Sequence, residues 1–479
     1  MVPASVDEAG EAAGGGGLQA DSLGQAAELD IRNSIILFRC SVTCKPQILQ
    51  RASARDLGID SPGGGWVDLR AVGSRRSLKS MNPHRRGILR PKQVRCANSA
   101  VVLQLLRRFD QLSRAELARR SGLSEGTVSR IVSGLLEQNL VAEAGVGSST
   151  GGRPPTGLQL SDAPWAIGVE IQNWETRFAV ASTRGVLRET RALRTPATPE
   201  ETVAMISAQV AEYCQGHGQA LPHGVGVTAR GIVDSREGVV RLGNAPGWVD
   251  VPLRAMLATA TGLPVALEHD VRAAAAAEYN YTDAGELAPH CLLYVRVDEG
   301  VGVGLVLDGE VYTGPSMAAG EFGQMVIADD GSGLRHDRPG CLEKLVSNMA
   351  VCDAYAETQG RANSASLADS AAKVRRICQG ATDGDPAAMQ VVTRAARYLA
   401  IGIVNVAWGL DPEVIALNST LNAVWPILSG AIEAQSPDSA EWPAFRGLRV
   451  QPSGLGEQGT LVGAATLAFA PLFQLDRAG

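Results

Sequence analysis

The chain has 479 residues, of which 45% are hydrophobic, 20% are charged and only 4% are aromatic. This composition is typical of a globular protein of about three domains with an aliphatic core, and it excludes a fibrous or wholly disordered chain. No apolar stretch reaches the ~18–20 residues of a membrane helix, and the acidic, Gly-rich residues 1–18 do not form a secretory signal. Eight scattered cysteines do not form a disulfide framework. We therefore expect a cytoplasmic protein without membrane contact.

The net charge of −6 conceals a basic segment. Residues 81–160 carry twelve Lys and Arg against five Asp and Glu, whereas residues 161–479 carry 23 against 36. A compact basic segment joined to a large acidic body is typical of a nucleic-acid-binding module attached to a second functional unit. The alternative is that the basic residues form an ordinary solvated face.

Residues 1–80 show no sustained helical or strand period and contain runs of glycine, so we expect them to be disordered or weakly ordered. Met81 is followed at once by basic residues, and we interpret residues 81–96 as a basic arm. The change in composition leads to the hypothesis that the natural chain starts at Met81 and that residues 1–80 are a non-native extension. N-terminal sequencing of the natural protein tests this hypothesis, because residues upstream of Met81 would exclude it.

Residues 97–160 have the pattern of a winged helix-turn-helix domain. After a first amphipathic helix, residues 113–116 form a capping box that opens a second helix ending at Gly122. Ser124 then caps a third helix whose apolar residues recur at i, i+3, i+4, i+7 and i+8. The short turn between the last two helices defines the helix-turn-helix unit. Residues 140–160 predict two strands joined by a Gly-rich loop, which form a β-wing.

The third helix of such a unit enters the major groove, where residues near its N-terminus contact base edges. Hydroxyl groups suit phosphates or base edges, and an arginine can donate two hydrogen bonds to guanine. The candidate DNA-binding residues are Ser124, Glu125, Thr127, Ser129 and Arg130, together with Arg153 in the wing loop. The alternative is a helical bundle with a polar outer face.

From residue 161 onwards strands and helices alternate, which excludes a β-sandwich or a helical bundle. A strand-strand-strand-helix order begins near residue 166 and again near residue 291. This duplication predicts an actin-like body of two lobes with a cleft between them. We place the first lobe at residues 161–285 and the second at residues 286–479, with the C-terminal helix returning to the first lobe. The second lobe also contains predicted helices at residues 344–358, 367–378 and 386–408.

The order and spacing of five motifs resemble the repressor branch of the ROK family (repressors, open reading frames and sugar kinases). The resemblance spans about residues 95–479, and its motifs are Gly152-Arg153-Pro154-Pro155, Asn244-Ala245-Pro246-Gly247-Trp248, Glu268-His269-Asp270, Ala319-Gly320-Glu321-Phe322-Gly323 and Gly340-Cys341-Leu342-Glu343. It implies an α/β fold class, in which an N-terminal winged helix-turn-helix precedes a two-lobed, actin-like (ribonuclease H-like) sugar-kinase-type body. Members of this layout are winged-helix repressors whose sugar-binding body controls operator affinity, as homodimers or homotetramers.

Carboxylates and amides suit a sugar because each can bridge two of its hydroxyl groups. The resemblance implies the sugar-binding residues Asn244, His269, Asp270, Glu321, Gln324 and Glu343. Among them Asp270 stands where the kinases have their catalytic base, and Gln324 stands where the family has a histidine. The alternative is that these are ordinary surface residues.

The nucleotide-binding elements depart from the family pattern. The Gly-Gly-Thr turn after the first strand reads Gln172-Asn173-Trp174, the second phosphate turn reads Asp298-Glu299-Gly300-Val301-Gly302, and Leu417-Asn418-Ser419 replace the glycines on the adenosine side. Side chains and carboxylates at these places oppose phosphate binding. We therefore expect no kinase activity and no catalytic residues.

The zinc site of the family is depleted as well. Gln324 and Leu334 stand at ligand positions, and only the weak candidates His336 and Cys341 remain. Two ligands fall short of the four that a structural zinc site uses, so we expect no metal and no cofactor.

The expected function is that of a sugar-responsive DNA-binding transcriptional regulator of carbohydrate metabolism, acting as a repressor. Its expected partners are double-stranded operator DNA and a small sugar or sugar derivative. Two alternatives remain open: a sugar kinase with a DNA-binding head, and a regulator that has lost sugar binding and is controlled by a protein partner. Turnover of ATP with a sugar acceptor would establish the first.

Overall fold

The computed structural model describes residues 91–146, 156–218, 220–243, 247–282, 288–328, 340–362, 365–437 and 442–473. Residues 1–80 and the start of the basic arm lie outside this range, so the hypothesis of a start at Met81 stays a prediction. Four residues with expected roles also lie outside it: Arg153, Asn244, Leu334 and His336. Within the described residues, no helix is long and apolar enough to cross a membrane.

The described residues of the N-terminal domain form three helices and two paired strands. They are α2 (Pro91–Phe109), α3 (Arg114–Ser121), α4 (Glu125–Glu137), β1 (Val141–Val146) and β2 (Thr156–Leu160). The hydroxyl of Ser113 accepts from the backbone N–H of Glu116, whose carboxylate accepts from the N–H of Ser113 in return. Gly122 closes α3 with a left-handed φ of 70°, and Ser124 caps α4. The predicted helix-turn-helix is confirmed, and β1 pairs antiparallel with β2.

The body contains two five-stranded sheets. The strands of the first sheet are β3 (Trp165–Ile171), β4 (Glu175–Ser182), β5 (Leu187–Arg194), β6 (Val225–Ala229) and β10 (Val265–His269), and those of the second are β11 (Cys291–Val297), β12 (Val301–Leu307), β13 (Glu310–Tyr312), β14 (Val414–Ser419) and β15 (Arg449–Pro452). The first sheet has the order β5-β4-β3-β6-β10 and the second the order β13-β12-β11-β14-β15. In each, the first three strands pair antiparallel and the last three pair parallel. The predicted duplication is therefore confirmed.

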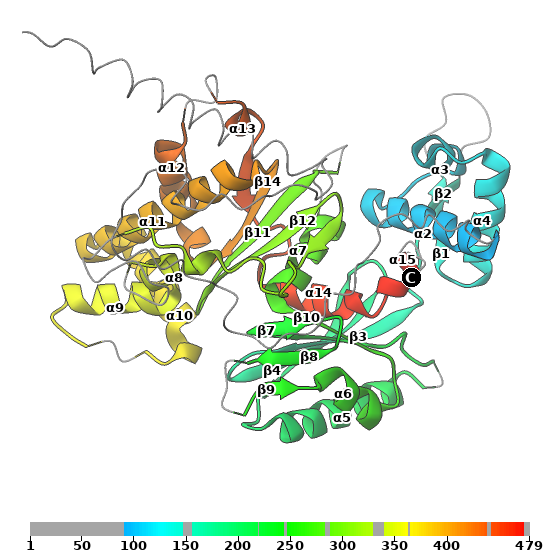
Figure 1. Cartoon of the computed structure of the whole chain (residues 1–479), viewed down its shortest axis with the longest axis horizontal. Helices are drawn as coiled ribbons and strands as arrows, with labels where there is room; N and C mark the ends of the chain where they lie inside the picture. The colour runs from blue at the N-terminus through cyan, green and yellow to red at the C-terminus, as the bar shows by residue number, and fades with distance from the viewer. Residues whose placement is uncertain are drawn as a thin grey trace, which may run out of the picture. The chain divides into compact units, whose positions relative to one another are not determined.

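Helices cover both faces of the first sheet (Figure 1). On one face, α5 (Pro199–Gly216) and α6 (Leu253–Thr261) share a core with alternate strand residues such as Val225 and Val227. On the other face, α14 (Gly459–Leu467) lies directly on the strands. Gly226 makes this approach possible, because a Cβ there would lie 1.8 Å from the carbonyl oxygen of Ala464.

The second sheet carries α7 (Asp270–Tyr281) on one face and a larger helical layer on the other. The helices of that layer are α8 (Leu342–Val346), α9 (Asn348–Thr358), α10 (Leu367–Thr382), α11 (Pro386–Leu410), α12 (Trp425–Gln435) and α13 (Pro443–Arg446). Since α7 also packs against α14, the pair α7–α14 lies between the two sheets and connects them.

Two features of the body differ from the sequence-based expectation. The helix expected over residues 344–358 is broken, because Ser347 adopts an extended ψ of 159° and its hydroxyl caps α9 at the N–H of Ala350. A small antiparallel sheet formed by β7 (Ile232–Asp234), β8 (Val239–Leu242) and β9 (Val249–Val251) was not predicted. Its strands of three or four residues are too short to show a hydrophobic period.

The C-terminal segment packs into the core of the helix-turn-helix domain. After α14 the chain continues through Phe469 into α15 (Ala470–Phe473). Both phenylalanine rings belong to the same buried cluster as Leu106 of α2 and Val128 of α4. The side-chain amide of Gln104 donates to the carbonyl oxygen of Phe473 at 2.6 Å. The body and the N-terminal domain are therefore joined by buried apolar contacts as well as by the chain.

Candidate functional site

The structure places the described DNA-binding candidates at the start of α4. Ser124, Glu125, Ser129 and Arg130 are exposed and Thr127 is half-buried, whereas the intervening Val128 and Ile131 face the core. The Nε of Arg130 donates to the carbonyl oxygen of Gly126 at 3.3 Å, within the same helix. The exposed side of α4 is thus polar at its N-terminal end, as a recognition helix requires.

A cavity of about 400 Å³ opens where parallel strands of both sheets end. Arg230 follows β6, Asp270 follows β10 and Asp298 follows β11. Ligands of open α/β sheets bind at these carboxyl ends. Of the residues expected to contact a sugar, the cavity is lined by His269, Asp270, Glu321, Gln324 and Glu343.

Asp270 is the most constrained of these residues. Its side chain is 6% exposed, and its Oδ1 accepts from the N–H of Val271 at 2.8 Å. Its Oδ2 lies 3.3 Å from both Arg230 Nε and Arg296 Nη1. Burial opposes ionisation, but electrostatic interactions with His269, Arg296 and Arg230 hold the pKa of Asp270 below its usual value. The carboxylate is therefore ionised at neutral pH and available as a hydrogen-bond acceptor.

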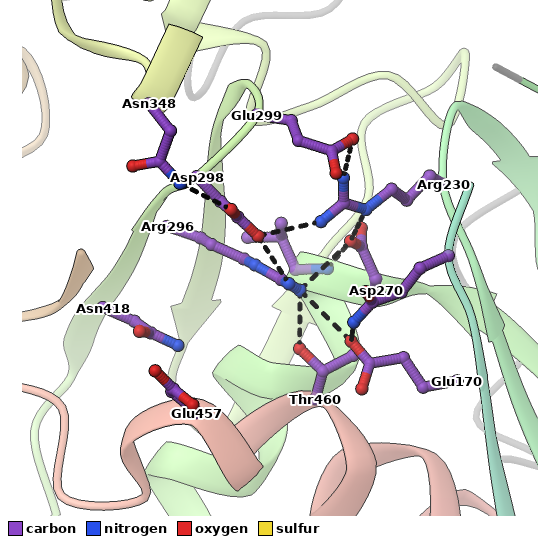
Figure 2. Close-up of polar contacts among 12 residues, drawn as sticks. Glu170, Arg230, Asp270, Arg296, Asp298, Glu299, Asn348, Asn418, Glu457 and Thr460 are labelled. Carbon is purple, nitrogen blue, oxygen red and sulfur yellow. Dashed lines mark hydrogen bonds and ion pairs between the residues drawn. The ribbon is translucent and has the colours of Figure 1, made fainter. Parts of the chain in front are cut away.

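Arg296 holds four elements together at the base of the cleft. Figure 2 shows its guanidinium between Glu170 of β3, Asp270 of α7 and Asp298, with the hydroxyl of Thr460 on α14 beside it. The three nitrogen–oxygen distances to the carboxylates are 3.5, 3.3 and 3.0 Å in that order. Burial disfavours the charge, but these carboxylates, Asp270 foremost, raise the pKa of Arg296. Arg296 thus links both sheets through buried ion pairs.

Arg230 and Glu299 form a second group of contacts at the edge of the cavity. Arg230 lies 2.7 Å from Glu299 Oε2 and 3.1 Å from Asp298 Oδ2. Asn173 donates to the same Oε2 of Glu299 at 2.8 Å. Arg230 and Arg296 together face more carboxyl groups than they can neutralise. Burial, with the neighbouring charge of Asp298, raises the pKa of Glu299 to about 7.

This elevated pKa predicts a pH dependence of stability. A carboxyl whose pKa is higher in the folded than in the unfolded protein favours folding at low pH, and this contribution is lost as the pH rises through the folded pKa. Between pH 5 and pH 8 the Glu299 carboxyl is therefore expected to lower the melting temperature as the pH rises. Glu299→Gln should flatten this slope in thermal unfolding followed by circular dichroism. An unchanged slope in the variant would show that Glu299 does not titrate in this range.

Glu343 is oriented by the backbone of the second sheet. Its Oε2 accepts from the N–H of Val301 at 3.0 Å. Gly300 leaves room for this contact, because a Cβ there would lie 2.7 Å from the same oxygen. The remaining lone pairs of the Glu343 carboxylate are available to a ligand in the cavity.

Polar side chains at two of the turns expected to depart from the nucleotide-binding pattern are hydrogen-bonded within the protein. Gln172 donates to Glu170 at 2.9 Å, and Asn173 donates to Glu299. Asn418 donates to the hydroxyl of Tyr294 at 2.8 Å and to the carbonyl oxygen of Gly456 at 2.9 Å. The side-chain amide groups of Gln172, Asn173 and Asn418 therefore donate to other groups of the protein.

Of the residues at the expected zinc positions, the structure describes Gln324 and Cys341. Gln324 offers an amide where the family has a histidine, and zinc prefers thiolate, imidazole and carboxylate ligands. Cys341 is buried at the start of α8. No three His, Cys, Asp or Glu side chains come together as a metal site anywhere in the described ranges.

The sequence analysis missed Arg230 and Arg296, which line the cleft, and Glu170, which is paired with Arg296. Arg296 and Glu170 lie within strands, where single charged residues carry no signal for a site. Arg230 directly follows a buried strand, and a charged residue at that place in a parallel sheet was the only available signal.

A helix-turn-helix domain joined to a two-lobed body with a polar interlobe cleft defines a DNA-binding protein with a sugar-kinase-like effector domain. Comparison with known families agrees: the ROK family profile matches residues 166–470, and the IclR helix-turn-helix domain profile matches residues 97–145. The chain belongs to the ROK family. The fold class expected from the sequence is confirmed.

Among curated relatives, the xylose repressor of Bacillus spizizenii is 23% identical over 380 residues, which cover 78% of this chain and 95% of that protein. The DNA-binding transcriptional repressor Mlc of Escherichia coli is 26% identical over 393 residues, which cover 78% of this chain and 93% of that protein.

Solved structures show the same architecture. A ROK family transcriptional regulator, described as a homologue of the E. coli Mlc protein, is 24% identical with a TM-score of 0.62, covering 80% of this chain and 98% of its own. A ROK hexokinase from Thermus thermophilus is 27% identical with a TM-score of 0.51, covering 64% of this chain and 98% of its own.

Proposed function

We propose that this protein is a sugar-responsive transcriptional repressor that is released from its operator by a sugar bound in the cleft. The observation that carries the proposal is the convergence of Asp270, Glu321 and Glu343 on one cavity, in a chain with an exposed polar helix at its DNA-binding domain. The similarity to repressors, one of them a xylose repressor, supports it. We place the protein in the cytoplasm, where operator DNA is found.

The charge of the cavity favours a neutral sugar. Its lining contains two arginines, Arg230 and Arg296, and both are already paired with carboxylates. The carboxyl groups in the lining outnumber them: Asp270, Asp298, Glu299, Glu321 and Glu343. A sugar phosphate or a nucleotide would bring further negative charge into this field, at an energetic cost.

We propose further that the protein has no kinase activity and needs no cofactor. The residues at the turns expected to bind nucleotide support this, because side chains stand where the family pattern has glycines and those of Gln172, Asn173 and Asn418 bond to protein groups. The alternative of a sugar kinase predicts ATP-dependent phosphorylation of a sugar by the full-length protein.

DNA binding is proposed to involve α4 and two copies of the chain. A homodimer or homotetramer would present two copies of α4 to half-sites about one helical turn apart, near 34 Å. Such a protein would select a pseudo-palindromic operator.

Arg130→Ala is expected to weaken operator binding about tenfold, since a good arginine–base contact contributes about 1–3 kcal/mol. The fold should be unaffected, because Arg130 is exposed. Fluorescence anisotropy with a labelled operator measures the loss, and Arg236→Ala, at an exposed arginine of the first lobe, is the matched control. Equal affinities for both variants would exclude a contact by Arg130.

Thermal melting of the full-length protein against sugars, sugar phosphates and ATP tests the ligand class. A ligand at a hundred times its dissociation constant stabilises the fold by about 2.7 kcal/mol. The proposal predicts that a free sugar raises the melting temperature and that ATP leaves it unchanged. A shift with ATP would favour the kinase, and no shift with any compound would favour regulation by a protein partner.

A further inference from the structure

A second cavity, of about 870 Å³, lies beside the sugar cleft in the first lobe. Its walls are the turn after β3, the segment 194–198 after β5, and Trp248 just before β9. Asn173 and Arg230 line this cavity and the cleft as well. The two cavities are therefore neighbours with a shared wall, and both fall within the ~300–1,000 Å³ of small-molecule sites.

The cleft contains an unsatisfied acceptor next to the two shared residues. Asn173 and Arg230 both donate to Oε2 of Glu299, at 2.8 and 2.7 Å. The other oxygen of the same carboxyl group, Oε1, is buried and has no hydrogen-bond partner among the described residues. The Glu299 side chain is 8% exposed and lines the cleft. A buried acceptor of this kind needs a donor, and a ligand hydroxyl beside the wall would supply one.

The second cavity has the lining that a sugar ring prefers. Trp174 is half-buried and contributes its indole ring, whereas Trp248 is only 5% exposed and belongs to the core of the first lobe. Ile171 and Pro196 add apolar surface. A pyranose ring exposes C–H groups on its faces and hydroxyl groups at its edge, so it stacks on an indole and leaves its hydroxyls for polar groups at the rim. Arg194 and Asn173 are polar residues of the same lining.

Backbone hydrogen bonds hold both tryptophans in place. The carbonyl oxygen of Trp174 accepts from the N–H of Thr195 at 3.0 Å, and that of Trp248 accepts from the N–H of Gly243 at 2.7 Å. The hydroxyl of Thr195 donates to the carbonyl oxygen of Gln172 at 2.9 Å, which closes the turn after β3. A preformed aromatic site of this kind loses little conformational entropy when a ligand binds.

We propose that the effector is a disaccharide, whose first ring occupies the cleft and whose second ring stacks in the second cavity against Trp174. The glycosidic linkage passes beside Asn173 and Arg230, which line both cavities. A hydroxyl of the first ring donates to Oε1 of Glu299 in the cleft. A monosaccharide in the cleft leaves the second cavity without a ligand. This proposal rests on the proposed sugar response and specifies the ligand of the same site.

Calorimetric titration of the full-length protein tests the proposal. The probes are xylose with xylobiose, and glucose with cellobiose and maltose. One or more of the disaccharides should bind about tenfold more tightly than the monosaccharide from which it is built. This is a difference of about 1.4 kcal/mol in binding free energy. Trp174→Ala should remove this preference and leave monosaccharide binding unchanged, while Trp174→Phe should keep most of it. Trp408→Ala, at an exposed tryptophan of α11, is the matched control.

The outcomes separate this proposal from the proposed function. A monosaccharide that binds and releases operator DNA, with no disaccharide binding more tightly, would overturn the second-ring site and leave the repressor function standing. A disaccharide preference that survives Trp174→Ala would also overturn it. Disaccharide binding that depends on Trp174 but does not change operator affinity would support the site and contradict the proposed function. If no sugar of the panel binds, both proposals fail.

Discussion

Asp270→Asn is expected to lower sugar affinity about 10- to 100-fold and to leave operator affinity in the absence of sugar unchanged. A hydrogen bond to a charged group contributes about 1.5–3 kcal/mol, and the ionised carboxylate of Asp270 lines the cleft. Asparagine has the same shape and can still accept the hydrogen bond from the N–H of Val271. Calorimetry with the sugar found by melting measures the first quantity, and anisotropy with labelled operator measures the second.

Stability must be followed in the same variant, because Arg230 and Arg296 each lose one counter-charge in a buried place. The melting temperature is expected to fall without loss of cooperative unfolding. Asp250→Asn is the control, since Asp250 forms an exposed ion pair with Arg241 and such pairs contribute little. Equal losses of sugar and operator binding in Asp270→Asn would show that Asp270 is structural.

Phe469→Ala is expected to uncouple the sugar cleft from the DNA-binding domain. Asp270 is the first residue of α7, α7 packs against α14, and the chain leaves α14 through Phe469. The ring of Phe469 is fully buried in the core that also contains Val128 of α4. If sugar binding moves α7, we expect the displacement to reach the DNA-binding domain through this ring, because packed contacts transmit displacement.

In this variant the sugar should bind with unchanged affinity, while its effect on operator affinity should fall to less than about twofold. Truncation of a buried phenylalanine costs about 3–5 kcal/mol, so the melting of the DNA-binding domain must be monitored. Phe445→Ala removes a buried ring from the core of the second lobe and is the matched control. A sugar effect of wild-type size in Phe469→Ala would show that coupling takes another route.

Local signals made the DNA-binding domain predictable from its sequence. The capping box at Ser113, the glycine at 122 and the cap at Ser124 act over three or four residues, and each appears in the structure as expected. The small sheet of β7, β8 and β9 lacked any such signal. The break at Ser347 was missed because a serine that caps a helix and a serine inside a helix look alike in an apolar period.

The cleft was predictable only in part. Asp270 and Glu343 were expected there from motifs, and the structure brings them to one cavity. Glu170 and Arg296 meet because β3 and β11 belong to different sheets that face each other across α7 and α14, and their pairing spans 126 residues of sequence. Trp174 was interpreted only as a replacement in a phosphate turn, although the structure gives its ring a place in a second cavity.

The most direct measurement is the affinity of the full-length protein for its operator with and without sugar. The operator is first selected from a random duplex pool, and the sugar is taken from the melting panel. Anisotropy titrations of the labelled operator should then show a 5- to 150-fold weaker affinity at saturating sugar, the range that coupling energies of about 1–3 kcal/mol produce. An operator affinity that stays the same at saturating sugar would contradict the proposed repressor mechanism.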